Sequence, residues 1–323
     1  MDTGFLEKIN GKFKGKDIVS LDQFTPKDIE ILFSHIKKMR TIAMNAMSCD
    51  ILAGKNVVLL FYEPSSRTRG SFDAATKQLG GQTIVVENPQ QFSSVSKGEN
   101  FEDTIRVFEA YSDLIVLRHP EEGASEKASK IAKFVPIINA GDGKGEHPTQ
   151  ALLDLCTIYE KFGRLENLTG VLVGDPLNSR AIHSLIRGLA LYPKNTIYLL
   201  SPKELKLSKS DFQEFSSRKI KLIEIHDEKD MPKNADFWYW TRVQKERFED
   251  QKAYEKIKDS FHLTKEFLNK YGNKNLIILD PLPRVGKIDM SVDDDPRAVY
   301  LTSQIRNGMY VRMALLGLML GKL

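Results

Sequence analysis

The sequence predicts an α/β protein that consists of two doubly wound parallel-sheet domains. The chain has 323 residues, which is too long for one small hydrophobic core and suits two domains of ordinary size. Strand-like apolar runs alternate with helical stretches along the chain, and this alternation is typical of parallel sheets covered by helices. A second series of strands begins at Thr169, so we expect a domain boundary near the helix that starts at His147 and Pro148.

The expected elements follow in chain order. The first strand is the apolar run 57–62, and it leads into a helix with Phe72, Ala75 and Leu79 at helical spacing. The later strands are expected at 83–87, 114–117, 136–139, 169–174, 196–200, 221–225, 235–240 and 276–279. Amphipathic stretches between strands include 101–111, 124–134 and 151–162. The last helix, 302–320, is mainly apolar and has no strand after it.

Composition indicates a soluble globular protein, with 41% hydrophobic and 28% charged residues. The longest apolar stretch, 313–320, is far short of the ~20 residues of a membrane helix, and no apolar segment of a secretory signal follows Met1. The net charge of +4 rests on scattered lysines without interleaved aromatic residues, which argues against nucleic-acid binding. Cys49 and Cys156 form neither a disulfide framework nor a zinc site. We therefore expect a cytoplasmic protein without a metal.

One segment combines a helix start with hydroxyls and guanidiniums: Ser65-Ser66-Arg67-Thr68-Arg69. It lies between the first strand and the first helix of the βα alternation. The unpaired N–H groups and positive dipole end of a helix N-terminus are suited to hold a phosphate. Arginine adds a planar fork that contacts two phosphate oxygens. The alternative is an ordinary N-cap, but a cap needs one hydroxyl and gives no reason for Arg67 and Arg69.

This segment resembles the carbamoyl-phosphate signature of the aspartate and ornithine carbamoyltransferases. The family pattern is usually Ser-Thr-Arg-Thr-Arg, and Ser66 keeps the hydroxyl of the first Thr. The resemblance implies an active site in the cleft between the two domains. It also implies that the C-terminal helix packs on the first domain. We therefore expect a carbamoyl-phosphate-binding domain of residues 1–147 plus 299–323, and an aspartate-binding domain of residues 148–298.

Two further segments match the donor site of the family. Arg118 follows the strand 114–117, at the sheet edge where open α/β sheets bind ligands. His147-Pro148-Thr149-Gln150 matches the family motif residue for residue. The resemblance implies that Arg118 and His147 contact the carbamoyl oxygen and that Gln150 contacts the carbamoyl amide. The glycines at 141, 143 and 145 do not have the G-x-G-x-x-G order of a dinucleotide loop, so no cofactor is expected.

The segment Ser93-Ser94-Val95-Ser96-Lys97-Gly98-Glu99 has the composition of a mobile loop. By resemblance, this loop reaches the active site of a neighbouring subunit, where Ser93 and Lys97 contact the ligand. This implies a homotrimer with shared active sites. The sequence leaves open whether a regulatory chain binds such a trimer.

The second domain is expected to bind the acceptor. Arg180 follows the strand 169–174 through a short turn, and Arg242 and Gln244 follow the strand that ends at Trp240. Two arginines at two strand ends can bind the two carboxylates of a dicarboxylic amino acid. Thr-Arg-Val-Gln-Lys-Glu-Arg, residues 241–247, is characteristic of the aspartate branch of the family, and the motifs of the ornithine branch are absent.

A proline-rich segment, Asp280-Pro281-Leu282-Pro283-Arg284, follows the last strand. The prolines restrict the backbone, so that carbonyl groups can be directed at a ligand amine or amide. The resemblance implies that Leu282 and Pro283 bind carbamoyl phosphate. The family usually has His where this chain has Asp280, which leaves the role of position 280 open. Arg284 is a candidate for an ion pair with an acid across the domain interface.

The resemblance implies carbamoyl transfer from carbamoyl phosphate to L-aspartate, the committed step of pyrimidine biosynthesis, with no cofactor. In this hypothesis Arg67, Thr68, Arg118 and His147 are catalytic. The residues expected to bind the donor are Ser65, Ser66, Arg67, Thr68, Arg118, His147, Gln150, Leu282 and Pro283. Those expected to bind aspartate are Lys97, Arg180, Arg242 and Gln244. The alternatives are another acceptor, such as ornithine, and a non-catalytic phosphate-binding module.

Overall fold

The computed structural model describes residues 6–45, 49–244, 255, 257 and 260–323. Its contacts divide the chain into two compact units. Unit 1 contains Met1–Leu153 and Arg306–Leu323, and unit 2 contains Asp154–Ile305. The unit boundaries fall within α7 (Pro148–Phe162) and α12 (Ser303–Met319).

Unit 1 is built on a four-stranded parallel sheet with the order β2-β1-β3-β4. Its strands are β1 (Asn56–Phe61), β2 (Gln82–Glu87), β3 (Leu114–His119) and β4 (Ile137–Asp142). Its helices are α1 (Pro26–Ser34), α2 (Ile36–Met44), α3 (Ser66–Gln78), α4 (Pro89–Phe92), α5 (Phe101–Glu109) and α6 (Ala124–Ile131). Two 3-10 turns, Leu21–Gln23 and Ser94–Lys97, complete it.

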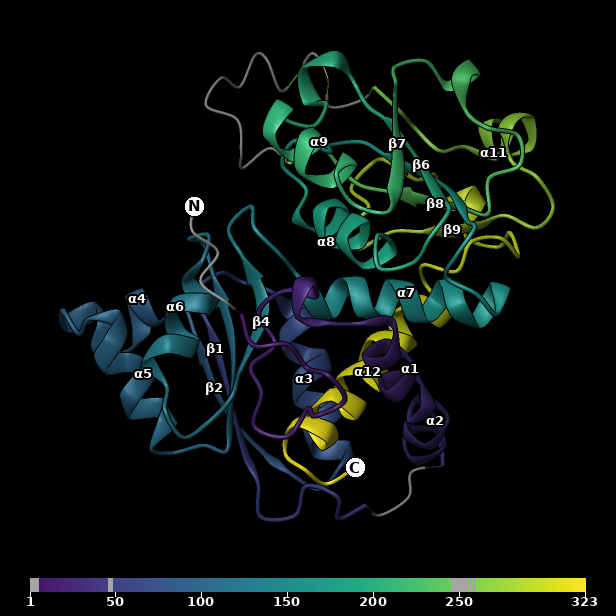
Figure 1. Ribbon diagram of the computed structural model, residues 1–323. Helices are drawn as coiled ribbons and strands as arrows, with labels where there is room; N and C mark the ends of the chain where they lie inside the picture. The colour runs from purple at the N-terminus through teal and green to yellow at the C-terminus, as the bar shows by residue number, and fades with distance from the viewer. Residues whose placement is uncertain (1–5, 46–48, 245–254, 256, 258–259) are drawn as a thin grey trace. The chain divides into compact units, whose positions relative to one another are not determined.

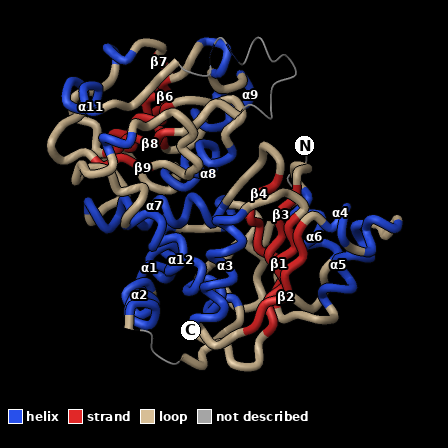
Figure 2. Tube along the Cα trace, turned by 180° about the vertical axis from the view of Figure 1, so that it is seen from behind, coloured by secondary structure: helices blue, strands red, loops and turns tan. Residues whose placement is uncertain are grey.

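Both faces of the unit 1 sheet are covered by helices, because its central strands carry apolar side chains on each face. Helices α5 and α6 lie on one side of the strands, and α3 and α12 lie on the other (Figure 2). Val58 and Leu60 of β1 belong to the core that α5 and α6 cover. On the opposite side, Phe72 of α3 is fully buried, and the Arg312 guanidinium of α12 lies 5.0 Å from its ring centroid.

Unit 2 repeats the architecture with a five-stranded parallel sheet of order β7-β6-β5-β8-β9. Its strands are β5 (Thr169–Val173), β6 (Asn195–Leu200), β7 (Ile220–Ile225), β8 (Phe237–Trp240) and β9 (Ile277–Leu279). Its helices include α8 (Arg180–Leu189), α9 (Lys209–Ser216) and α11 (Lys265–Tyr271) (Figure 1). The 3-10 turns in the described part of this unit are Lys203–Leu205, Glu228–Asp230 and Met290–Val292. Trp238 and Trp240 are fully buried in its core.

Each sheet has a point where the strand order reverses. In unit 1, β1 has β2 on one side and β3 on the other, so the chain winds outward from the β1–β3 pair. In unit 2 the reversal lies between β5 and β8. Ligands of open α/β sheets bind beyond the carboxyl ends of the strands at such switch points. The strand order alone therefore predicts ligand sites at the segments after β1, β3, β5 and β8.

The nine expected strands and their parallel pairing are confirmed, with differences at some element ends. The expected strand 114–117 continues to His119, so Arg118 lies within β3 and not after it. The expected helix 124–134 ends at Ile131, because the N–H groups of Lys133 and Phe134 donate to the Glu109 carboxylate, each at 2.5 Å. The segment expected to be a mobile loop forms a 3-10 turn, which the Ser93 hydroxyl caps by accepting the Val95 N–H.

No described helix is long and apolar enough to span a membrane. Among residues 6–45, 49–244, 255, 257 and 260–323, no group of three or more His, Cys, Asp or Glu side chains is arranged to hold a metal ion.

Candidate active site

The first predicted site segment lies at the switch point of unit 1. Ser65 ends the loop after β1, and α3 begins at Ser66. The Ser65 side chain makes no capping hydrogen bond, so its hydroxyl does not serve as an ordinary N-cap. Ser66 and Arg67 are exposed, whereas Thr68 is buried. The first-turn N–H groups of an α-helix have no intrahelical partner, so this end of α3 has the properties of an anion site.

The two arginines of this segment have different surroundings. Arg69 forms an ion pair with Glu87 at the end of β2, with 2.7 Å between Nε and Oε1. This pair ties α3 to the neighbouring strand, so Arg69 has a structural role that the sequence did not reveal. Arg67 lies two residues earlier and is exposed, which makes it the arginine of the segment that is accessible to a ligand.

Arg118 lies beside the end of β1, since it pairs in register with Phe61. Its Nη1 donates to the Ala140 carbonyl of β4 at 3.2 Å, and its Nη2 lies 3.3 Å from Oε2 of Glu63. The side chain is only 13% exposed. The guanidinium is therefore held at the carboxyl ends of β1, β3 and β4, next to the start of α3.

His147 lies beside the first turn of α3. It is buried, it precedes α7 directly, and its Nε2 lies 3.5 Å from the Thr68 hydroxyl. The carbonyl of His147 accepts the N–H of Gln150 at 3.0 Å, so the two predicted residues share the first turn of α7. The structure thus brings together Thr68 and His147, which are 79 residues apart in the sequence.

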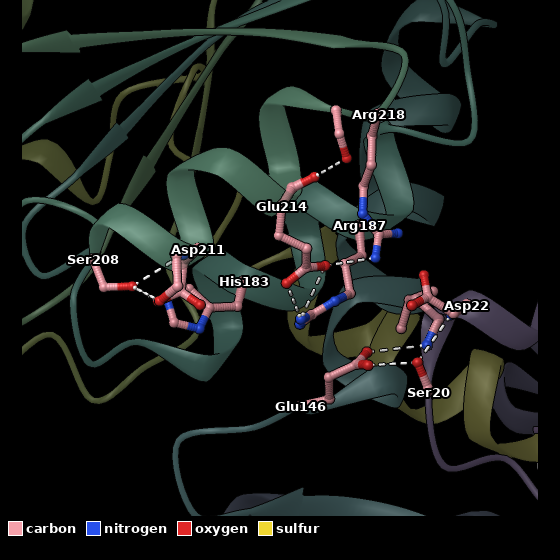
Figure 3. A network of polar contacts seen from close by, with 12 residues as sticks. Ser20, Asp22, Glu146, His183, Arg187, Ser208, Asp211, Glu214 and Arg218 are labelled. Atoms are coloured by element: carbon pink, nitrogen blue, oxygen red, sulfur yellow. Dashed lines mark hydrogen bonds and ion pairs between the residues drawn. The ribbon is translucent and has the colours of Figure 1, made fainter. Parts of the chain in front are cut away.

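The loop that carries His147 is fixed by two carboxylates. Asp142 is buried and accepts the N–H of Glu146 at 2.9 Å and that of Gly123 at 3.1 Å. Glu146 in turn accepts the Ser20 hydroxyl at 2.5 Å and the Leu21 N–H at 3.0 Å (Figure 3). Because both oxygens of Glu146 are engaged, the residue next to His147 is anchored to the N-terminal part of unit 1.

Ser93 and Lys97 lie on the Ser94–Lys97 turn and its cap. The Ser93 hydroxyl donates to the Pro89 carbonyl at 2.7 Å, and Lys97 is exposed. Their contact with a ligand of a neighbouring subunit stays a prediction.

The predicted acceptor residues of unit 2 lie after β5 and β8, at its switch point. Arg180 is the first residue of α8, whose N-cap is Ser179, and Arg242 and Gln244 follow β8. The remaining residues of that motif, 245–247, lie outside the described part of the chain. Gly174, at the end of β5, has φ +118°, and a Cβ there would lie 2.2 Å from the Thr241 carbonyl oxygen. Only glycine therefore allows the two segments to approach so closely.

A buried carboxylate joins the two acceptor segments. Asp175 accepts the N–H of Asn178 at 3.1 Å and that of Gln244 at 3.2 Å. The Gln244 side-chain amide also donates to the Asn178 carbonyl at 2.9 Å. The turn before Arg180 is therefore hydrogen-bonded directly to the segment after β8. Asp175 was not among the predicted site residues, although an Asp between a strand end and a helix start is typical of a side chain that caps a turn.

His183 holds the same turn from within α8. Its Nε2 lies 2.7 Å from the Pro176 carbonyl oxygen, and since a carbonyl only accepts, Nε2 carries the proton. Burial lowers the pKa of His183, so the ring favours its neutral form. Helix α8 is tied to α9 because Glu214 pairs with Arg187 at 3.1 Å and with Arg218 at 2.6 Å (Figure 3).

The proline-rich segment follows β9 in unit 2. Asp280 is buried, the Leu282–Pro283 peptide bond is cis, and Leu282 has φ +58°. Arg284 forms an ion pair with Asp293, which also accepts the Tyr300 hydroxyl at 2.7 Å. The expectation that Arg284 pairs with an acid across the domain interface is wrong, because Asp293 is only nine residues away and belongs to the same unit.

Two domain families match the chain in sequence. Residues 16–160 match the aspartate/ornithine carbamoyltransferase, carbamoyl-P binding domain, and residues 166–319 match the aspartate/ornithine carbamoyltransferase, Asp/Orn binding domain. The chain belongs to the aspartate/ornithine carbamoyltransferase family. The resemblance that rested on Ser65, Arg67, His147 and the other motif residues is thereby confirmed.

Relatives within this carbamoyltransferase family are similar over nearly the whole chain. The aspartate carbamoyltransferase catalytic subunit of Methanocaldococcus jannaschii is 43% identical over 93% of this chain and 96% of its own length. The multifunctional protein pyr1-3 of Dictyostelium discoideum is 45% identical over 95% of this chain, which spans 14% of that longer protein.

A solved structure of the family shares the architecture. Aspartate transcarbamoylase from Trypanosoma cruzi, in complex with carbamoyl phosphate and aspartate, superimposes with a TM-score of 0.89. It is 34% identical over 98% of this chain and 100% of its own.

Proposed function

We propose that this protein transfers the carbamoyl group of carbamoyl phosphate to the amine of L-aspartate, giving N-carbamoyl-L-aspartate and phosphate. One observation supports this proposal above the others: beside the N-terminus of α3 the Thr68 hydroxyl lies 3.5 Å from Nε2 of His147, and the Arg118 guanidinium is held at the carboxyl ends of β1, β3 and β4. That arrangement combines an anion site with several hydrogen-bond donors. Carbamoyl phosphate, an anion with a reactive carbonyl group, requires both.

We assign the donor sites to these residues by their chemistry. The phosphate would be held by the α3 N-terminus with Ser65, Ser66 and Arg67, and by Lys97 of a neighbouring subunit. The carbonyl oxygen would accept hydrogen bonds from Thr68, Arg118 and His147. The carbamoyl amide would contact Gln150, Leu282 and Pro283.

The acceptor site would use Arg180 and Arg242 for the two carboxylates of aspartate, with Gln244 as a further donor and Lys97 as a further cation. Asp175 favours this assignment because it hydrogen-bonds both segments that carry these side chains. The Methanocaldococcus jannaschii relative and the Trypanosoma cruzi structure are named for aspartate and not for ornithine, which supports aspartate over the ornithine alternative.

In the proposed reaction the neutral amine of aspartate attacks the carbonyl carbon. The new N–C bond places negative charge on the carbonyl oxygen, which the three donors stabilise. Removal of one such donor typically lowers turnover by about 10²–10³-fold. The C–O bond to phosphate then breaks, and the leaving phosphate accepts the amine proton. The main contribution of the protein is to orient donor and acceptor and to stabilise this charge.

The domain functions, assembly and location belong to the same proposal. Residues 1–147 with 299–323 would bind carbamoyl phosphate, and residues 148–298 would bind aspartate. A homotrimer with shared sites would supply Ser93 and Lys97 to a neighbour, and a regulatory chain is a further partner to test for. We propose a cytoplasmic enzyme of pyrimidine biosynthesis, while noting that relatives from Pisum sativum are named chloroplastic.

The decisive experiment offers carbamoyl phosphate with either aspartate or ornithine and measures both phosphate and the carbamoylated amino acid. Product from aspartate alone supports the proposal, and product from ornithine alone would replace it by the alternative. Arg67→Ala should abolish activity, because it removes a charged phosphate contact. Arg69→Ala is a matched control, since it removes an equal charge two residues away whose partner is Glu87. Equal activity of both variants would contradict the phosphate assignment.

A further inference from the structure

The segment Asp280-Pro281-Leu282-Pro283 has few backbone donors, because proline has no N–H. Between positions 280 and 283 only Asp280 and Leu282 carry a backbone N–H group. Both groups have defined partners. The Asp280 N–H donates to Oε1 of Gln304 at 3.0 Å, and the Leu282 N–H donates to the carboxylate of Asp280. Two side chains therefore restrain every backbone donor of the segment.

Gln304 is itself held in a buried chain of hydrogen bonds. Its Nε2 donates to Oδ1 of Asp154 at 2.7 Å, and Oδ2 of Asp154 accepts the Tyr239 hydroxyl at 2.8 Å. Gln304, Asp154 and Tyr239 are each at most 2% exposed. The amide orientation of Gln304 is determined because the carboxylate can only accept, which leaves Oε1 for the Asp280 N–H. Asp154 and Gln304 lie 150 residues apart in the sequence.

The backbone of this segment requires such support. Leu282 adopts φ +58°, in the left-handed region that non-glycine residues seldom occupy. A residue held there persists only where its surroundings over-determine the conformation, and such residues cluster at ligand sites. Leu282 is half-buried and Pro283 is exposed, so neither is fixed by deep burial. The hydrogen bonds accepted by Gln304 and by the Asp280 carboxylate restrain the backbone on both sides of Pro281.

We propose that Asp280 and Gln304 are positioning residues that direct the backbone carbonyls of Leu282 and Pro283 at the amide of carbamoyl phosphate, with Asp154 as the anchor of Gln304. This inference rests on the proposed function. It also gives a role to Asp280, which stands where the family usually has His. The position needs an acceptor for the Leu282 N–H, and both a carboxylate and a neutral imidazole nitrogen supply one.

The first test compares Asp280→Ala with Asp280→Asn. The alanine variant loses the acceptor, whereas the Asn side-chain oxygen can still accept the Leu282 N–H. Because misdirection of a ligand contact can cost up to about 100-fold, we expect Asp280→Ala to lower kcat/KM for carbamoyl phosphate by about 10- to 100-fold. Asp280→Asn should keep kcat/KM within about threefold of the value of the natural protein, because an amide oxygen accepts a hydrogen bond only modestly less strongly than a carboxylate does.

Inhibition by inorganic phosphate separates positioning from general damage. Phosphate should bind the α3 segment of unit 1 and needs no carbonyl of residues 281–283. Its inhibition constant should therefore stay unchanged in Asp280→Ala while the KM for carbamoyl phosphate rises. An equal loss of phosphate and carbamoyl phosphate binding would overturn the proposal.

The second test makes the Gln304 contact depend on pH. In Gln304→Glu, a protonated carboxyl group can donate to Asp154 and accept the Asp280 N–H, as the amide does. The ionised form loses the donor and repels Asp154. The titratable groups at this position are Asp154 of α7, Tyr239 of β8 and Asp280 after β9. Because adjacent buried carboxylates share a proton with a raised pKa, the contact is present at low pH and lost as pH rises.

We expect the ratio of kcat/KM for Gln304→Glu to that of the natural protein to fall about tenfold between about pH 6 and about pH 9, the range in which such buried carboxyl groups titrate. Gln304→Met should give a low ratio that is independent of pH. Tyr239→Phe is the matched control: it removes a buried hydrogen bond to Asp154 but leaves the link to Asp280, so kcat/KM should change less than about threefold.

The outcomes distinguish the two levels of inference. A natural protein that does not carbamoylate aspartate overturns the proposed function. If the natural protein is active, two results would overturn the positioning role alone. One is a kcat/KM ratio of Gln304→Glu to the natural protein that does not change with pH. The other is a kcat/KM of Asp280→Ala equal to that of Tyr239→Phe. If Gln304→Met does not fold, Gln304→Glu and the Asp280 pair still decide the question.

Discussion

Asp175 offers the sharpest test of how unit 2 is organised. Its side chain is fully buried, and it accepts the backbone N–H groups of Asn178 and Gln244. Asp175→Ala leaves both groups without this acceptor. A buried donor that loses its partner costs about 1–3 kcal/mol, so the two together should lower the free energy of unfolding by about 2–6 kcal/mol. This is a large part of the 5–15 kcal/mol, roughly, that stabilises a typical domain.

The kinetic effect should be selective, because Asp175 joins the segments that carry Arg180 and Gln244. We expect the KM for aspartate to rise at least about tenfold, since a displaced binding group can cost up to about 100-fold. The affinity for carbamoyl phosphate should remain within about threefold. Asp175→Asn keeps one acceptor oxygen and should lie between the alanine variant and the natural protein in both measurements.

Urea unfolding gives the stability change, and initial rates with each substrate varied in turn give the two KM values. The reasoning fails if Asp175→Ala unfolds at the same urea concentration as the natural protein. It also fails if the KM for aspartate is unchanged in a folded variant, because the two segments would then not depend on this carboxylate.

Three further perturbations test other contacts. Arg242→Ala should raise the KM for aspartate steeply and leave the inhibition constant of phosphate unchanged, and an unaltered aspartate dependence would show that the acceptor site is misassigned. His183→Leu removes the donor to the Pro176 carbonyl and should raise the KM for aspartate about 2- to 10-fold, the value of one hydrogen bond; His183→Gln, which keeps a donor, should reverse most of this rise. Burial raises the pKa of Asp17 from 3.8 to about 6, so the folded state binds its proton more tightly than the unfolded state does, and stability falls as pH rises between these values. Asp17→Asn can still accept the Ile137 N–H, so it should raise the free energy of unfolding by about 1–3 kcal/mol at pH 8 but not below about pH 4. Urea unfolding at both pH values measures this difference. An equal effect at both would refute the raised pKa of Asp17.

Local sequence patterns were sufficient to predict features that depend on neighbouring residues. The apolar runs predicted the nine strands of the described residues, and Ser65-Ser66-Arg67-Thr68-Arg69 indicated both the helix start and the family. The same patterns could not separate the two arginines. Arg67 and Arg69 look alike in the sequence, and only the tertiary structure shows that Arg69 forms an ion pair with Glu87 at the end of the neighbouring strand.

Two further predictions failed because they concern contacts outside the segment that was read. Arg284 was expected to pair with an acid across the domain interface, and its partner is Asp293 of the same unit. Arg118 was expected after a strand, but β3 extends past it because β1 and β4 continue alongside. The position at which a strand ends depends on the strands that pair with it, and the residues of the strand itself do not determine those partners.

By itself, the sequence determined the elements, the parallel α/β class, the family and the residue types of the two half-sites. These properties follow from the period of apolar residues and from short motifs, which act over a few neighbouring positions. Only the tertiary structure decided the strand orders, and with them that the segments after β1 and β3, and after β5 and β8, lie at switch points. It also decided the contact of Asp175 with Gln244 and that of Gln304 with Asp154. These contacts join residues that are 69 and 150 positions apart in the chain, so they exist only once the sheets have formed.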